Sequence, residues 1–154
     1  MSDPFVTKNI LKWYDLNKRS LPWRKNVSKE KRQYNTLISE FMLQQTQVAT
    51  VIPYFNKFVK EIPNIKKLAS VDNKKLIKLW EGLGYYSRAR NLKKAAQSVI
   101  KNFNGEIPDS FDDLKSLPGI GDYTANAILA IAFNKPYIPM DGNVERILKR
   151  YLYL

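Results

Sequence analysis

Apolar residues recur along the chain at spacings of three and four, which is the period of helices that bury one face. No stretch shows convincing alternation of a half-buried strand, and no repeat or low-complexity tract interrupts the pattern. The pattern therefore predicts an all-α bundle with short loops. The expected helices cover residues 10–16, 37–43, 48–59, 68–71, 76–80, 87–100, 111–117, 123–132 and 143–154.

Polar residues and prolines predict where several of these helices begin. Asp72 or Asn73 suits the N-cap of the helix over residues 76–80, and Ser87 is expected to cap the long helix that follows. Pro53 is expected near a helix start or at a bend. Residues 17–33 are polar and basic, and we expect them to form a loop.

The composition limits the chemistry that the chain can perform. Its 154 residues are enough for a domain with a real core, and 44% of them are hydrophobic. There is no cysteine and no histidine. Disulfides, thiolate catalysis and cysteine-ligated zinc or iron–sulfur sites are therefore excluded within these residues, and no metal site is expected. A general acid or base must be a carboxylate, a lysine, a tyrosine or water.

The net charge is +12, and the basic residues are spread along the chain. Such a surface is typical of proteins that bind phosphate backbones. The alternative is an AT-rich genome, which favours Lys, Asn and Ile codons without any nucleic-acid partner. The N-terminus lacks the pattern of a signal peptide, and no apolar run approaches the roughly 20 residues that span a bilayer. We therefore expect a cytoplasmic protein without a membrane partner.

The segment LPGIGDYTANA, residues 117–127, lies between two expected helices. Gly119 and Gly121 allow a tight turn, and Ile120 can anchor that turn in the core. The amides after Gly119 would then face outward at a helix N-terminus, where they can bind a phosphate oxygen without reading bases. The alternative is an ordinary hairpin of two helices.

The extended pattern L-P-G-I-G-x-x-T-A-x-A resembles the helix–hairpin–helix motif of the DNA glycosylase superfamily. SEFMLQQTQVATVIPYF at 39–55, GLGYYSRARNL at 82–92 and MDGNVERIL at 140–148 resemble the A/G-specific adenine DNA glycosylases of that superfamily. The resemblance implies a base-excision-repair enzyme that hydrolyses the N-glycosidic bond of adenine. Its partner would be double-stranded DNA with A·8-oxoguanine or A·G mispairs. A monomer associated with a bacterial nucleoid is expected.

Two carboxylates are the expected centre of the chemistry. The neighbours of Glu40 are nearly all apolar, and burial among them would raise its pKa so that it stays protonated. In the resembled family this position protonates adenine at N7, whereas the alternative is a surface glutamate. Asp141 would stabilise the oxocarbenium-like sugar, with Asn143 supporting it by hydrogen bonding; the alternative is a helix N-cap.

Tyr123 distinguishes two branches of the superfamily. Endonuclease III-like enzymes carry a lysine at the matching position, and that lysine forms a Schiff base with the sugar. A tyrosine cannot do so, and the resemblance therefore implies a monofunctional glycosylase. Tyr123 would help to orient Asp141 or the sugar. Its alternative role is packing at the start of a helix.

The resemblance also implies a set of DNA contacts. Gln45 and Tyr85 would insert into the duplex beside the lesion, which offsets the stacking lost when a base is flipped. The alternatives are a polar cap for Gln45 and a core aromatic for Tyr85. The remaining residues expected to contact DNA or to line the adenine pocket are Arg19, Trp23, Arg24, Arg88, Gly119 and Gly121.

Full-length members of the resembled family continue into a [4Fe–4S] lobe and a C-terminal domain that recognises 8-oxoguanine. We expect residues 1–20 to be an N-terminal helix of that second lobe, 21–135 the six-helix core with its hairpin, and 136–154 a linker with Asp141 and a truncated final helix. The second lobe is expected to be largely missing. A catalytically impaired DNA-binding module is therefore the alternative to an active enzyme.

Overall fold

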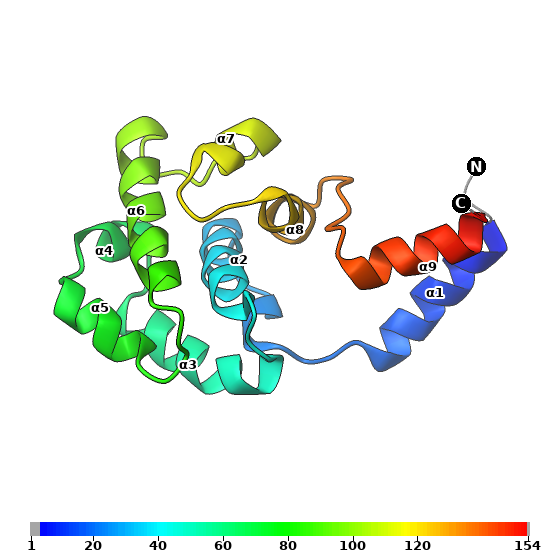
Figure 1. Ribbon diagram of the computed structural model, residues 1–154, viewed down its shortest axis with the longest axis horizontal. Helices are drawn as coiled ribbons and strands as arrows, with labels where there is room; N and C mark the ends of the chain where they lie inside the picture. The colour runs from blue at the N-terminus through cyan, green and yellow to red at the C-terminus, as the bar shows by residue number, and fades with distance from the viewer. Residues whose placement is uncertain (1–3, 154) are drawn as a thin grey trace.

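The computed structural model describes residues 4–153, and the chain over this range is helical without strands (Figure 1). The prediction of an all-α bundle is confirmed. The elements in chain order are α1 (Pro4–Asn17), the 3₁₀ helix η1 (Pro22–Arg24), α2 (Lys29–Leu43), α3 (Val48–Glu61), α4 (Ile65–Ser70), α5 (Asn73–Trp80), α6 (Ser87–Asn102), α7 (Phe111–Ser116), α8 (Asp122–Phe133) and α9 (Gly142–Leu152).

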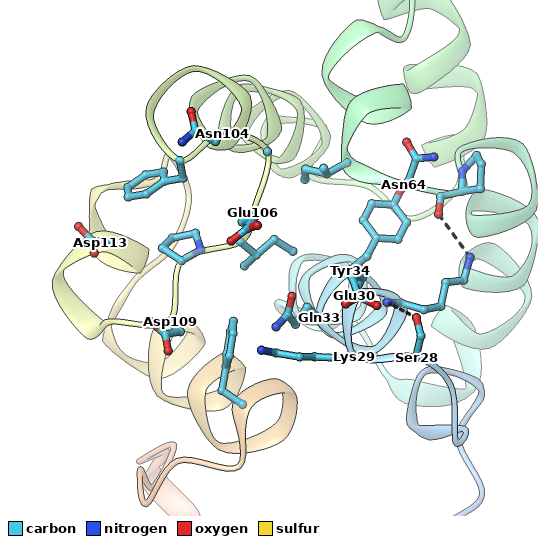
Figure 2. Close-up of a pocket in the computed structure, with 18 residues that line it drawn as sticks. Ser28, Lys29, Glu30, Gln33, Tyr34, Asn64, Asn104, Glu106, Asp109 and Asp113 are labelled. Carbon is cyan, nitrogen blue, oxygen red and sulfur yellow. Dashed lines mark hydrogen bonds between the residues drawn. The ribbon is translucent and has the colours of Figure 1, made fainter.

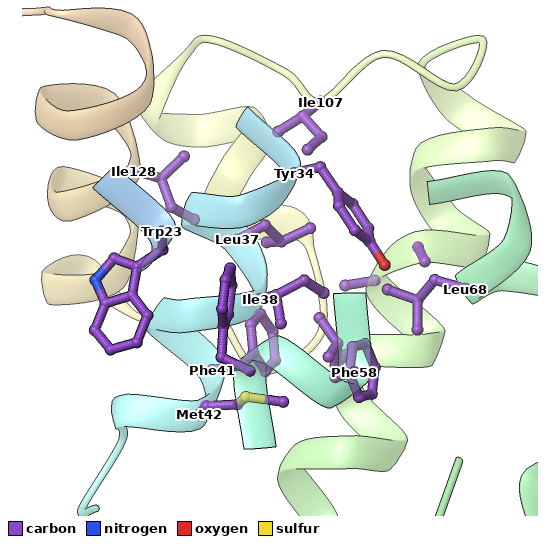
Figure 3. Packing of buried hydrophobic residues seen from close by; sticks show 14 of the residues in the cluster. Trp23, Tyr34, Leu37, Ile38, Phe41, Met42, Phe58, Leu68, Ile107 and Ile128 are labelled. Atoms are coloured by element: carbon purple, nitrogen blue, oxygen red, sulfur yellow. The ribbon is translucent and has the colours of Figure 1, made fainter. Parts of the chain in front are cut away.

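Helix α2 forms the centre of the body. It contacts α3, α6, α8 and η1, and every residue from Tyr34 to Met42 is buried. A helix that is buried all round needs apolar residues on every face. Leu37, Ile38 and Phe41 supply them, and Figure 3 shows these side chains among the core residues contributed by the surrounding helices. Because α2 is held on all sides, the residues at its C-terminal end occupy fixed positions.

The structure confirms only some of the helix caps that the sequence predicts. Asp72 caps α5 as expected, accepting hydrogen bonds from the amides of Lys74 and Lys75. The cap predicted at Ser87 is wrong: Ser87 is the first residue of α6, and its N-cap Tyr86 makes no capping hydrogen bond. The preceding turn holds Tyr85 at a φ of +44°, and the side chain of Arg88 donates hydrogen bonds to the carbonyls of Leu83 and Gly84 within it.

The stretch over residues 17–33 is more ordered than the loop that was expected. It contains η1, and α2 already begins at Lys29, where Ser28 Oγ accepts the amide of Lys31 at 3.3 Å. Pro53 lies inside α3 and not in its first turn. The sequence pattern missed these boundaries because the first turns of α2 carry mostly charged residues.

Helices α1 and α9 contain no buried residue. Both extend from the same side of the body in Figure 1. Large apolar side chains on them are exposed, including Leu16 at 78% and Ile147 at 65%. Within residues 4–153, no helix combines the length and apolar character needed to cross a bilayer.

Candidate active site

A cavity of about 570 Å³ opens at the C-terminal end of α2. Its walls come from η1, the end of α2 with the loop that follows, the first turns of α8 and the segment before α9. Glu40, Tyr123 and Asp141, which lie far apart in the sequence, all line it. Four further residues expected at the adenine or DNA site share the cavity: Arg19, Trp23, Arg24 and Gln45.

Glu40 is the buried acid of this cavity. Its side chain is 8% exposed. Burial raises its pKa to about 7, and the nearby charge of Arg24 opposes this shift only partly. The burial expected from its apolar neighbours is thus confirmed. A carboxyl group with this pKa is protonated in a substantial fraction of molecules at neutral pH and can donate a proton to a bound group.

Tyr123 lies within electrostatic reach of both carboxyl groups. Burial is the main cause that raises the pKa of its hydroxyl, and the charges of Glu40 and Asp141 add to that shift. The hydroxyl is therefore neutral at physiological pH and can donate a hydrogen bond. The side chain is 46% exposed, so it faces the cavity mouth instead of the core.

Asp141 is exposed and caps α9. Its Oδ1 accepts hydrogen bonds from the amides of Asn143 at 2.9 Å and Val144 at 2.8 Å. The N-cap considered as an alternative is therefore present, and the same carboxylate also lines the cavity. Asn143 supports Asp141 through its backbone amide, while its side-chain Oδ1 accepts a hydrogen bond from Arg146 at 3.3 Å.

The hairpin is docked against the end of α2. Gly119 has a φ of +83°, and a Cβ there would lie 2.8 Å from side-chain atoms of both Phe41 and Asn91. Ile120 is buried, as expected of the anchor of the turn. Helix α8 begins without a side-chain cap, and a Cβ at Gly121 would meet no atom within 4 Å. The first amides of this helix thus have no side-chain cap, and amides at a helix start suit an anionic oxygen.

Gln44 and Thr124 join the hairpin to α2, and the sequence did not single them out. Nε2 of Gln44 donates to the carbonyl of Gly119 at 3.2 Å and to Oγ1 of Thr124 at 3.4 Å. Thr124 is 5% exposed. Both residues lie in the motifs that carry the family resemblance, but their partners come from a distant part of the chain, and no local pattern reveals such a pairing.

The profile of the HhH-GPD superfamily of base excision DNA repair proteins matches residues 38–154. The chain belongs to this superfamily. The adenine DNA glycosylase of Buchnera aphidicola subsp. Baizongia pistaciae is 48% identical over 145 residues, which cover 94% of this chain and 40% of the relative. The adenine DNA glycosylase of Rattus norvegicus is 47% identical over 148 residues, which cover 93% of this chain and 29% of the relative.

The HhH-GPD chain thus spans less than half the length of these curated relatives. A solved structure of a thermostable thymine-DNA glycosylase has the same fold, with a TM-score of 0.83 and 26% identity. The match covers 94% of this chain and 65% of that one.

The expected DNA contacts of this HhH-GPD chain divide into exposed and buried residues. Gln45 and Tyr85 lie at loop tips with φ values of +56° and +44°, and both are exposed. Tyr85 is 64% exposed, so the alternative of a core aromatic is wrong. Arg88 is different: it is 6% exposed, and its guanidinium faces backbone carbonyls at the end of α2. It is therefore not placed for the direct DNA contact expected of it.

A larger cleft of about 760 Å³ lies at the opposite, N-terminal end of α2. Figure 2 shows Lys29 and Glu30 on one wall and Glu106 and Asp109 on the other. Hydrogen bonds from its own backbone and from Ser28 lower the pKa of Glu30. A hydrogen bond from Lys135 lowers the pKa of Asp109. The carboxylates of Glu30 and Asp109 are therefore ionised at neutral pH and cannot serve as proton donors.

The iron–sulfur cluster implied by the family resemblance does not fit the residues present. Such a cluster is held by cysteine thiolates, and the chain has none. Over residues 4–153, no group of three or more His, Cys, Asp or Glu side chains is arranged to hold a metal ion. The groups that line the cavity and can exchange a proton include its carboxyl groups and its tyrosine.

Proposed function

We propose that the chain is the catalytic core of a monofunctional adenine DNA glycosylase that acts on adenine paired with 8-oxoguanine or guanine. The observation that carries this proposal is the cavity in which the protonatable Glu40 lies with Tyr123 and the exposed carboxylate of Asp141. The names of the relatives at 47–48% identity support adenine as the released base. The net charge of +12 supports duplex DNA as the partner. The proposed protein acts as a monomer at the bacterial nucleoid.

The proposed reaction breaks the bond between adenine N9 and the sugar C1′. Glu40 donates its proton to N7, and adenine leaves with the bonding electron pair. The carboxylate of Asp141 stabilises the positive charge that develops on the sugar. Water then adds to C1′ and gives up its proton, which restores the acid form of Glu40 directly or through solvent. Tyr123 has no amine, so no Schiff base forms and the DNA strand stays intact.

A single-turnover assay of base release tests the proposal. The 154-residue chain is mixed in excess with duplexes that contain one A·8-oxoguanine or one A·G pair, and free adenine is measured over time. We expect adenine release from both duplexes, none from an A·T duplex, and no protein–DNA adduct after borohydride treatment. An adduct would contradict the monofunctional reaction, and the absence of adenine release from both mispairs would contradict the catalytic proposal.

One observation favours a second function, that of a DNA-binding module without catalysis. Helix α9, which Asp141 caps, has no buried residue to hold it against the body. If the carboxylate is not held at the cavity, the hairpin would still bind duplex DNA. This function predicts salt-dependent binding with little preference for mispairs and no adenine release.

A further inference from the structure

Arg88 is a buried charged residue that the reaction proposed above does not use. It lies in the first turn of α6 and is 6% exposed. Its guanidinium donates mainly to backbone carbonyls, which belong to the C-terminal end of α2 and to the loop between α5 and α6. Burying a cation is costly unless its donors are satisfied; Nη1 and Nη2 of Arg88 have acceptors, whereas the buried Nε has none. The contacts of Arg88 therefore point to a specific task at this place in the fold.

One arm of the guanidinium caps the C-terminal end of α2. Nη1 of Arg88 donates to the carbonyl of Met42 at 2.8 Å and approaches that of Phe41 at 3.4 Å. The carbonyl of Gln44 and, at 3.0 Å, Oγ1 of Thr46 also lie within hydrogen-bond distance, so the two hydrogens of Nη1 are shared among these acceptors. The last carbonyls of a helix lack partners within the helix, and a positive charge is favourable there. This arm thus fixes the exit from α2 and the loop that follows.

The other arm holds the loop between α5 and α6. Nη2 of Arg88 donates to the carbonyls of Leu83 at 3.0 Å and Gly84 at 3.2 Å. The buried indole of Trp80 donates to the same Gly84 carbonyl at 3.3 Å, and its ring lies 5.6 Å from the guanidinium carbon. The guanidinium carbon also lies 5.7 Å from the ring of Tyr85.

Each of the two loops presents one exposed side chain from a left-handed backbone position. Gln45 follows directly on the carbonyl of Gln44, and Tyr85 follows directly on that of Gly84. Residues other than glycine rarely adopt a positive φ, and they keep it only where surrounding contacts hold the backbone. The hydrogen bonds of Arg88 act on the residue immediately before each of these positions.

We propose that Arg88 is a positioning residue that latches the Gln45 loop to the Tyr85 loop, so that both side chains enter the duplex as one unit. This inference rests on the proposed function, because insertion matters only if the chain distorts DNA at a lesion. In this arrangement Arg88 touches no phosphate. Its removal should therefore lower the extent of base unstacking without changing the number of ionic contacts.

The test compares Arg88→Met with Arg90→Met, a matched control on the same helix whose side chain is exposed. The probe is a duplex with 2-aminopurine next to an A·8-oxoguanine pair, whose fluorescence rises when bases unstack. We expect Arg88→Met to lower the unstacking equilibrium constant about tenfold or more and to leave the salt dependence of binding unchanged. Arg90→Met should leave unstacking within about twofold, and any phosphate contact that it removes would reduce the salt slope by about one.

Amide hydrogen exchange of the DNA-free chain supplies a second measurement. If Arg88 latches the two loops, Arg88→Met should accelerate amide exchange over residues 44–46 and 83–86 together, relative to the unsubstituted chain. Exchange in the core of α2 should remain slow. Acceleration in neither loop or in only one of them would overturn the inference. If Arg88→Met does not fold, Thr46→Val removes one acceptor of the same cluster, and it should shift both measurements in the same direction by a smaller factor.

Replacing Arg88 in a doubly substituted chain distinguishes a positioning role of Arg88 from a general loss of stability. In a chain that already carries Gln45→Ala and Tyr85→Ala, loss of Arg88 should change unstacking by less than about twofold, because the side chains that it positions are gone. Additive effects would overturn the inference. If the unsubstituted chain fails to unstack the probe, the proposed function fails, and the role of the latch in DNA insertion fails with it. The exchange experiment would then report only whether Arg88 holds the loops.

Discussion

Each end of α2 opens onto a cleft that is lined by a glutamate of this helix. The two glutamates differ in burial and in the direction of their pKa shifts. At the N-terminal end the cleft is larger, about 760 Å³, and Glu30 is exposed with a lowered pKa. At the C-terminal end the cavity is about 570 Å³, and Glu40 is buried with a pKa raised to about 7. The size of a cleft therefore does not indicate which carboxyl group can carry a proton at neutral pH. Desolvation does, because it changes which protonation state a carboxyl group holds at that pH.

The caps at the two ends of α2 also differ in their exposure to solvent. The first turn is capped by the hydroxyl of Ser28 at the surface, an interaction that water could largely replace. The last turn is capped by the guanidinium of Arg88, which is shielded from solvent. A shielded cap holds its helix end in one geometry. The end of α2 that carries Glu40 is thus the more rigidly defined of the two.

Replacement of the two glutamates gives the largest expected contrast. Glu40→Gln removes the proton donor of the cavity and should lower single-turnover adenine release by a factor of about 100 to 10,000. Glu30→Gln, the matched change at the other end of the helix, should leave release within about twofold. Duplex affinity, measured by fluorescence anisotropy, should stay similar in both variants. Equal rates for the two variants would remove Glu40 from the mechanism.

The free energy of unfolding should depend on pH in opposite ways for Glu40 and Glu30. The folded-state pKa of Glu40 lies above its ordinary value of 4.5, so its contribution to the free energy of unfolding is full below pH 4.5 and is lost as the pH rises through about 7. Glu40→Gln should therefore gain stability relative to the unsubstituted chain between pH 4.5 and 8, by about 3 kcal/mol. Urea unfolding at several pH values measures this difference.

Glu30→Gln serves as the control of opposite sign. The lowered pKa of Glu30 contributes stability above its unfolded-state pKa, and this contribution is lost as the pH falls. The variant should therefore lose a little stability at neutral pH and match the unsubstituted chain in acid. If the difference in free energy of unfolding between Glu40→Gln and the unsubstituted chain is the same at every pH, Glu40 is not desolvated in solution.

Much of the fold was predictable because the apolar period is strong where helices are buried. The same local logic identified the burial of Glu40 from its neighbours and the anchor role of Ile120. It also limited the cap of α5 to Asp72 or Asn73, of which Asp72 is the cap, since an N-cap depends only on residues that follow within one turn. Each of these features is determined by a short stretch of sequence, and a single sequence is therefore sufficient to predict them.

The features that escaped prediction depend on partners distant in sequence. An arginine in a basic motif suggests a phosphate contact, yet Arg88 is buried against carbonyls of α2. Those acceptors exist only once α6 packs beside the end of α2. The link between Gln44 and Thr124 has the same origin. Tyr86 occupies the N-cap position predicted for Ser87 because tertiary hydrogen bonds, and not a serine hydroxyl, shape the turn.

The hairpin supplies the next contrast at the C-terminal end of α2. Gly119→Ala would force a Cβ against Phe41 and Asn91 at a φ of +83°, and we expect a loss of about 2 kcal/mol or more in the free energy of unfolding. Gly121→Ala meets no neighbour and should change stability by less than about 0.5 kcal/mol. The Cβ at Gly121 should instead weaken duplex binding, since Gly121 is the N-cap of α8, beside the amides expected to bind a phosphate oxygen. Equal unfolding midpoints in urea for the two variants would show that the hairpin is not docked on α2.

The smallest expected effect concerns the exposed cap at the N-terminal end. Ser28→Ala removes the hydrogen bond to the amide of Lys31 and should lower the free energy of unfolding by about 1 kcal/mol. Ser87→Ala is the matched control, because Ser87 lies at a helix start without acting as its cap, and its effect should be close to zero. Adenine release by Ser28→Ala should be unchanged once the fraction of folded protein is accounted for. The reason is that the first turn of α2 can fray in water while α3, α6 and α8 still hold the buried turns that carry Glu40. A drop in release that exceeds the loss of folded protein would mean that the two ends of α2 are coupled, and that the exposed cap also sets the position of the acid.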